Sequence, residues 1–217
     1  MKLESYGILI AIRPINERDA LAHVFSRDYG VIAGVMRGAV VTKKNKPLVG
    51  QTGGVVWNAR LDSQLGTFHW DIERNVAANI MLNTNALMAM NAAFSLIDVL
   101  LPEREAYLDL YHATIALLEK LASDDVARTY LDWEIKLLHD LGYALDLSRC
   151  SGCGVKHDLN YLSPRTGRAV CDTCAVPYLN KLYKLPLNLN VTLCFLENVC
   201  VQQGVGLPVM RTILKII

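Results

Sequence analysis

The sequence Cys150-Ser151-Gly152-Cys153 is followed, after seventeen intervening residues, by Cys171-Asp172-Thr173-Cys174. Each Cys-x-x-Cys pair projects two thiolates from a tight turn, and a loop of this length lets the second turn fold back against the first. Four sulfurs then close a tetrahedron around one zinc ion, and they leave no open position for water. The spacing therefore predicts a structural zinc site, not a catalytic one. His157, four residues beyond Cys153, is not needed as a ligand.

The same cysteines could form a redox-active pair or two disulfides. Two pairs at zinc spacing favour a metal over a redox pair. The chain opens with Met1-Lys2-Leu3-Glu4 and not with a charged and then apolar leader, so we expect a reducing, cytoplasmic compartment, where disulfides are rare. Cys194 and Cys200 lie six residues apart in an apolar stretch and are expected to be buried thiols.

Charge is unevenly distributed along the 217 residues, although the formal net charge is only +1. Residues 1–75 carry ten Lys or Arg against seven Asp or Glu, residues 76–149 five against eleven, and residues 150–217 seven against three. The middle is acidic and both ends are basic. This segregation is typical of a protein whose ends meet an anionic partner, although ordinary solvated faces explain it equally well.

Five short apolar runs in the first 75 residues predict strands at 5–13, 21–26, 31–36, 55–61 and 65–72, with Asp62-Ser63-Gln64 as a hairpin turn. Glycines and turn residues separate them. Five short strands in this length favour a small closed barrel of the OB-fold type, and an SH3-like barrel is the alternative.

From residue 73 the pattern becomes helical. The run Ile80–Leu101 is long, but Asn83, Asn85, Asn91 and Asp98 interrupt it, so we expect a buried helix and no membrane span. Thr84 is its predicted cap. Two further helices follow, the second preceded by Ser123-Asp124-Asp125 as a cap and ended by Gly142. Residues 178–189 and 193–217 are predicted to be helical as well.

The expected fold is a multidomain α+β protein with four parts. These are an OB-fold barrel (1–75), a helical bundle (76–149), an inserted four-cysteine zinc module (150–176) and C-terminal helices that pack on the bundle (177–217).

In this order, the sequence resembles the RecO family of bacterial recombination mediators, over nearly the whole chain. The residues that carry the resemblance are Ile12-Arg13-Pro14-Ile15-Asn16-Glu17, Val35-Met36-Arg37-Gly38-Ala39, Leu61-Asp62-Ser63-Gln64-Leu65-Gly66-Thr67-Phe68, Leu101-Pro102-Glu103-Arg104-Glu105, Trp133-Glu134-Ile135-Lys136-Leu137-Leu138, and Leu162-Ser163-Pro164-Arg165-Thr166-Gly167-Arg168.

The resemblance implies a non-enzymatic role in DNA repair, recombination and the DNA damage response. It implies binding of single- and double-stranded DNA and annealing of complementary strands. It also implies that the protein, with RecR, assists loading of RecA onto strands coated by single-stranded DNA-binding protein (SSB). The SSB C-terminal tail is expected on the helical domain, and the location is the cytoplasm, at the nucleoid. No membrane and no small-molecule substrate is expected.

Basic residues of the barrel are the candidates for phosphate contact, because Lys and Arg neutralise the nucleic-acid backbone. They are Arg37, Lys43, Lys44 and Lys46, with Arg13 and Arg27 as further candidates. Their other interpretation is a solubilising loop. Val40 and Val41 stand where the family often has further basic residues. Asp132 stands where the family commonly has an arginine suited to the SSB tail, so Arg128, one turn earlier, is the candidate there.

Sequence motifs of the common catalytic sites are missing: there is no P-loop, no Gly-x-Ser-x-Gly and no His-Glu-x-x-His. Two other functions remain. One is a zinc-stabilised protein-interaction adaptor that does not bind nucleic acid, and the other is a small redox protein that uses Cys150 to Cys174.

Overall fold

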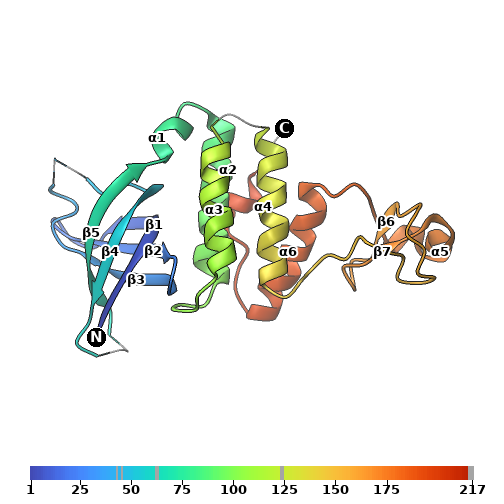
Figure 1. The fold of residues 1–217 in the computed structure, drawn as a ribbon, viewed down its shortest axis with the longest axis horizontal. Coiled ribbons are helices and arrows are strands. Elements are labelled where there is room, and N and C mark those ends of the chain that lie inside the picture. The colour runs from blue at the N-terminus through green and yellow to red at the C-terminus, as the bar shows by residue number, and fades with distance from the viewer. Residues whose placement is uncertain (43, 45, 62–63, 123–124, 215–217) are drawn as a thin grey trace. The chain divides into compact units, whose positions relative to one another are not determined.

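A computed structural model describes residues 1–217 except 43, 45, 62–63, 123–124 and 215–217. The chain forms two compact units (Figure 1). Unit 1 contains residues 1–130 and 208–217, and unit 2 contains residues 131–207. The expected division into four domains stays a prediction.

The amino-terminal part of unit 1 is built from five strands. They are β1 (Lys2–Pro14), β2 (Ala20–Ser26), β3 (Gly30–Met36), β4 (Gln51–Asn58) and β5 (Gly66–Asn75). Hydrogen bonds connect them in the order β1-β2-β3-β5-β4, and β4 pairs with β1 again, so the sheet is a closed barrel. The pairing of β3 with β5 is parallel and short, from Gly34↔Gly66 to Met36↔Phe68. The other pairs are antiparallel.

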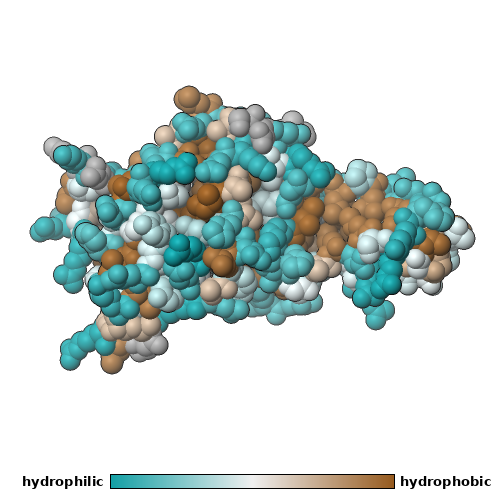
Figure 2. All heavy atoms as spheres, viewed as in Figure 1, coloured by the Kyte–Doolittle hydropathy of each residue, from teal (hydrophilic) through white to brown (hydrophobic). Residues whose placement is uncertain are grey.

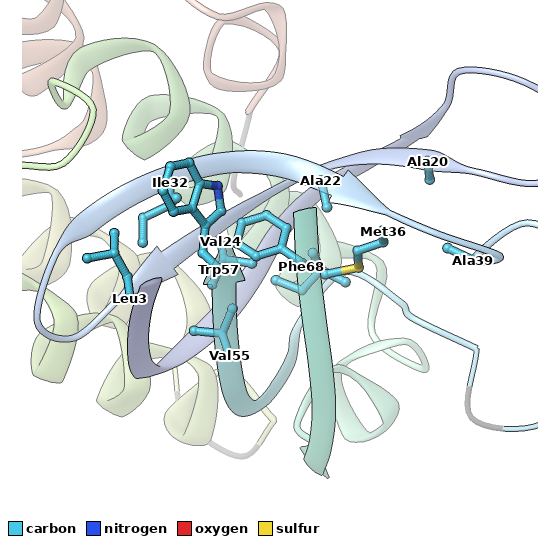
Figure 3. Close-up of a cluster of buried hydrophobic side chains, with 11 residues drawn as sticks. Leu3, Ala20, Ala22, Val24, Ile32, Met36, Ala39, Val55, Trp57 and Phe68 are labelled. Carbon is cyan, nitrogen blue, oxygen red and sulfur yellow. The ribbon is translucent and has the colours of Figure 1, made fainter. Parts of the chain in front are cut away.

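Alternating side chains fill the barrel, as the two-residue period of a strand requires. Figure 3 shows Val24, Ile32, Val55, Trp57 and Phe68 gathered in its interior. Trp57 is fully buried, and its Nε1–H donates to the Ala33 carbonyl at 2.9 Å, which satisfies the polar atom of this large side chain.

Gly53 and Gly54 lie inside β4, so the predicted start of this strand after them is wrong. The reason is a close approach between neighbouring strands. A Cβ on Gly53 would lie 2.0 Å from the Asp71 carbonyl oxygen of β5. Only glycine fits there, and its role is to permit strand pairing and not to form a turn.

Unit 1 continues with helices α1 (Ala77–Ile80), α2 (Thr84–Leu100) and α3 (Leu108–Lys120), and α4 (Val126–Asp140) extends from unit 1 into unit 2. The predicted cap of α2 is displaced by one residue. The Asn83 side chain, not that of Thr84, accepts hydrogen bonds from the backbone N–H groups of Asn85 and Ala86. At α4, Asp125 accepts from the Arg128 N–H at 3.1 Å. Ser123 and Asp124 lie outside the described residues.

The segment between α2 and α3 attaches the helices to the barrel. Glu103 forms a parallel bridge with Val31 of β3, and the Arg104 N–H donates to the Val31 carbonyl at 2.9 Å. Arg104 has a φ of +63°, and its guanidinium lies 4.5 Å from the centre of the Trp57 ring. Next to this segment, His23 of β2 pairs with Asp98 of α2. The barrel is thus joined to the segment after α2 by backbone contacts and to α2 itself by a side-chain contact.

Unit 2 contains β6 (Tyr161–Leu162), β7 (Ala169–Val170), α5 (Asp172–Ala175), the 3-10 helix η1 (Val176–Lys181), β8 (Tyr183–Lys184) and α6 (Leu189–Gln203). The predicted helix over 178–189 is wrong: Tyr183 and Lys184 pair with β6. The predicted helix from 193 onward is also wrong in its limits, because α6 ends at Gly204, with φ +69°, and a separate short helix α7 (Val209–Thr212) lies in unit 1.

Gly142, predicted to end α4, has a φ of +89° and its N–H donates to the His139 carbonyl at 3.0 Å. This geometry confirms the predicted end of the helix. Across the described part of the chain, no helix has the length and apolarity that a bilayer span requires.

Candidate metal centre and nucleic-acid surface

Four cysteines from two separate turns meet in unit 2. Cys150 and Cys153 lie in the turn before β6, Cys171 precedes α5, and Cys174 lies within α5. The β6–β7 hairpin returns the second pair to the first (Figure 1). All four sulfur atoms lie within 4.8 Å of one another. The fold therefore brings together the four residues that the sequence spacing predicted.

The first turn is fixed by its backbone. The Cys150 N–H donates to the Val155 carbonyl at 2.7 Å, and the Gly154 N–H donates to the Cys150 carbonyl at 2.9 Å. Gly154 has a φ of +81°, which glycine adopts without strain. Backbone N–H groups also point at the Cys150 sulfur, from Gly152 and from Cys171, each at 3.3 Å. Such donors stabilise a thiolate.

The cluster fits a tetrahedral ion. With metal–sulfur bonds of about 2.3 Å, ligand sulfurs are about 3.8 Å apart, and Sγ of Cys153 lies 3.6 Å from Sγ of Cys171. The Cys171 N–H, together with the other backbone donors, lowers the pKa of Cys150 to about 6, whereas the hydrogen bond with Cys153, followed by those with the other two sulfurs, raises the pKa of Cys174 to about 12. Four thiolates at this spacing repel one another, and a bound cation relieves that repulsion.

The remaining cysteines and His157 are separate from the cluster. His157 is exposed and contacts Asp158 at 2.8 Å. Cys194 and Cys200 lie on α6; Cys200 is buried as expected, and Cys194 is half-buried. The metal-binding group therefore has four thiolate ligands.

The predicted DNA-binding residues do not all lie together. Arg13 and Arg37 are exposed at the ends of β1 and β3, and Lys44 and Lys46 are exposed in the loop that follows β3. Lys43 lies outside the described residues. The loop after β3 is held against the β1–β2 turn, because the Gly38 N–H donates to Asp19 Oδ1 at 2.8 Å and the Val40 N–H donates to the Arg18 carbonyl at 3.0 Å. Ala20 and Ala39 mark this end of the barrel in Figure 3.

Sequence reasoning missed Arg18. The side chain is exposed in the β1–β2 turn, where Asn16 Oδ1 accepts from the Arg18 and Asp19 N–H groups at 2.8 and 2.7 Å. The pKa of Asp19 is lowered first by the Gly38 N–H and then by Asn16, and the positive charges of Arg18 and Arg37 act in the same direction. Both arginines are thus near the same carboxylate. The signal that could have found Arg18 is the Asn16 turn, which returns the chain beside the end of β3.

Arg27 occupies a different place. It lies in the turn between β2 and β3, bonded to Asp28 at 3.0 Å, and its guanidinium is 5.7 Å from the ring centre of Tyr6. Since Gly7 pairs with Ser26 whereas Pro14 pairs with Ala20, Arg27 lies at the opposite end of β2 from Arg13 and Arg37. We call the group Arg13, Arg18 and Arg37 the basic end of the barrel; Lys44 and Lys46 lie farther along the loop that follows β3.

Other candidate residues are placed as follows. Arg128 is exposed in the first turn of α4, and Asp132 is exposed one turn later. Among the aromatic residues of the barrel, Trp57 and Phe68 are core residues, Tyr29 and Trp70 are half-buried against the core, and Tyr6 is exposed.

A five-stranded barrel, a helical region and a four-cysteine metal-binding group define the class of this protein. Residues 1–71 match the family description "Recombination protein O N terminal", and residues 81–215 match "Recombination protein O C terminal". The chain belongs to the RecO family, and its role is in DNA repair and recombination.

Curated relatives agree with this assignment. The chain is 41% identical over 188 residues to "DNA repair protein RecO" of Ruegeria sp. (strain TM1040), covering 86% of this chain and 78% of that protein. It is 39% identical over 184 residues to the protein of the same name from Jannaschia sp. (strain CCS1), covering 84% and 74%, and 35% identical over 189 residues to that of Rickettsia canadensis (strain McKiel), covering 86% and 77%.

Proposed function

We propose that this protein is a non-enzymatic recombination mediator whose barrel binds single- and double-stranded DNA. The strand order β1-β2-β3-β5-β4, with β3 parallel to β5 and β4 returning to β1, supports assignment of the barrel as an OB-fold. OB-folds commonly bind single strands through a positively charged surface.

The observation that carries the proposal is the basic end of the barrel. Arg18 and Arg37 come from strand ends far apart in the sequence, yet both act on Asp19, and Lys44 and Lys46 follow in the same loop. Neither arginine forms an ion pair with a described residue. Uncommitted cations on the rim of a barrel are suited to phosphate contact, and the burial of Trp57 and Phe68 favours contact with the backbone over stacking on bases.

The partners follow from the family. We propose that the protein anneals complementary strands and, with RecR, assists RecA loading on SSB-coated strands in the cytoplasm, at the nucleoid. Arg128 is the candidate for the acidic SSB tail, because it is exposed on α4. The exposed Asp132 one turn later weakens the positive field there.

We propose zinc as the ion of the four-cysteine group, since a tetrahedral set of four thiolates is typical of structural zinc sites. When bound, the ion would be held by Cys150, Cys153, Cys171 and Cys174 and would hold the two turns together. An adaptor that binds no nucleic acid is the competing function, and the acidic residues 76–149 favour it.

The test is fluorescence anisotropy with labelled single- and double-stranded oligonucleotides over a salt series. The variant is Arg18→Ala with Arg37→Ala, and the matched control is Arg27→Ala with Lys2→Ala, which removes the same charge away from the basic end. Each lost phosphate contact reduces the slope of log K against log salt by about one. We expect the slope to fall by about two in the first variant only. Equal slopes in both variants, or no binding by the wild-type protein at low salt, would refute the proposal.

A further inference from the structure

A second cluster of arginines lies beside the metal-binding group. A pocket of about 250 Å³ in unit 2 is lined by Asp146, Arg149, Cys150, Ser151, Gly154 and Arg168. Pockets for whole small molecules usually exceed about 300 Å³. A pocket of this size, lined by two arginines, has room for a single phosphate group.

The two arginines are held on neighbouring segments. Asp146 forms a parallel bridge with Arg168: the Asp146 N–H donates to the Gly167 carbonyl at 2.9 Å, and the Ala169 N–H donates to the Asp146 carbonyl at 2.9 Å. The Ser151 N–H donates to the Ala169 carbonyl at 2.9 Å. These backbone hydrogen bonds fix the positions from which the Arg149 and Arg168 side chains extend. Less conformational entropy is therefore lost when both side chains contact one anion.

Neither Arg149 nor Arg168 forms an ion pair with another described residue. Both are exposed, and neither lies within salt-bridge distance of a carboxylate among the described residues. Asp146, the acidic residue of the pocket, is instead bound by Ser148, whose Oγ and N–H donate to Oδ1 at 2.6 and 3.0 Å. The pocket contains two cations and one anion, so it attracts a negative ligand.

The residues around the pocket also carry a net positive charge. Between residues 144 and 184, six Lys or Arg residues accompany three Asp residues. A zinc ion with four thiolates adds a charge of −2, which leaves the region positive by one. Figure 2 shows hydrophilic residues next to a hydrophobic patch on the surface at the place of β6, β7 and α5.

We propose that the pocket between Arg149 and Arg168 binds a phosphate group of the nucleic-acid backbone, as a second DNA contact separate from the basic end of the barrel. The proposal rests on the proposed DNA-binding function. It gives the metal a role beyond stability, because Cys150 and the turn to Gly154 form one wall of the pocket. An inorganic phosphate ion has the same chemistry and is the alternative ligand.

The test compares Arg149→Gln with Arg168→Gln, as one double variant, with a matched double variant in the same unit, Lys181→Gln with Lys184→Gln. Anisotropy with a single-stranded oligonucleotide and a salt series measures DNA binding, and release of zinc to a chromogenic chelator measures metal retention. We expect the arginine variant to lose about tenfold in affinity at low salt and about one unit of salt slope, with unchanged zinc release. We expect the lysine variant to change less.

Several outcomes would overturn the proposal. Faster zinc release in the arginine variant would show that the two guanidiniums neutralise the thiolates. Equal losses in both variants would show an unspecific effect of charge. If the Arg149 and Arg168 variant binds DNA with wild-type affinity while the Arg18 and Arg37 variant loses affinity, the pocket is not a DNA contact. The proposed function would then remain intact.

If the wild-type protein does not bind DNA, the proposed function fails instead. Calorimetric titration with inorganic phosphate then decides the pocket. If phosphate binds the wild-type protein and not the arginine variant, the pocket is a site for free phosphate and the proposed DNA contact is refuted. If phosphate does not bind the wild-type protein, the pocket is not an anion site.

Discussion

Substitution of Gly30 by alanine tests how the barrel is joined to the segment between α2 and α3. Gly30 has a φ of +64°, and a Cβ there would lie 1.8 Å from the carbonyl oxygen of Glu105. That oxygen belongs to the backbone and cannot turn away. Gly38 is the matched control, because it has a φ of +70° in the same barrel and no atom lies within 4 Å of its hypothetical Cβ.

The two substitutions share one cost and differ in the other. A residue with a side chain in the left-handed region costs about 1–2 kcal/mol, and forcing an atom into a packed site costs about 1–3 kcal/mol. Gly38→Ala should therefore lower the free energy of unfolding by about 1–2 kcal/mol, and Gly30→Ala by about 2–5 kcal/mol. With a urea m-value of about 2 kcal/mol per M, the midpoints fall by about 0.5–1 M and 1–2.5 M.

Urea unfolding followed by tryptophan fluorescence measures both midpoints, since Trp57 and Trp70 report on the barrel. Hydrogen exchange at the Arg104 N–H, which donates to the Val31 carbonyl, identifies the site of the additional loss. Equal losses in the two variants, or unchanged exchange at Arg104 in Gly30→Ala, would show that the Glu105 segment is not packed tightly against Gly30.

Three further predictions follow from other contacts. The hydrogen bond to Asp98 raises the pKa of His23, so this contact stabilises the fold fully below about pH 6.5 and less as the pH rises through the pKa of the folded state. His23→Ala should therefore lower the urea midpoint more at about pH 6 than at about pH 8.5. A loss that does not depend on pH would contradict this assignment. Asn188→Ala should lower the free energy of unfolding by about 1 kcal/mol, because the Asn188 side chain accepts hydrogen bonds from the N–H groups that begin α6. The control Asn190→Ala should lower it by less than about 0.5 kcal/mol, as measured by thermal melts. Similar losses in the two variants would rule out capping by Asn188. Removal of metal by a chelator should increase hydrogen exchange in residues 150–175 before it reduces DNA binding by the barrel, and simultaneous loss of both would refute this order.

Much of the metal-binding group could be predicted from the sequence. The spacing of Cys150, Cys153, Cys171 and Cys174 is a local property: two tight turns and a hairpin of fixed length are sufficient to bring the sulfurs together. Strand positions were also predictable, because apolar runs and turn residues act over a few positions. The predicted helix over 178–189 was wrong because pairing of Tyr183 and Lys184 with β6 prevailed over local apolar periodicity.

The candidate DNA surface required the tertiary structure. Arg13 and Arg37 were identified by charge alone, but so was Arg27, which lies at the other end of its strand. Arg18 was missed because the turn at Asn16 does not by itself show that Asp19 binds the Gly38 N–H. Arg149 and Arg168 likewise become neighbours only through the bridge between Asp146 and Arg168.

The sequence by itself therefore determined the family, the four cysteines of the metal-binding group and the order of the five barrel strands and of α2, α3 and α4, because each depends on residue types at short, fixed spacing. Only the tertiary structure decided that β3 meets β5 in parallel, that Glu105 packs against Gly30, and which cations share a surface. These depend on closure of the barrel around Trp57, a long-range packing event in which residues distant along the chain are brought together to bury one core.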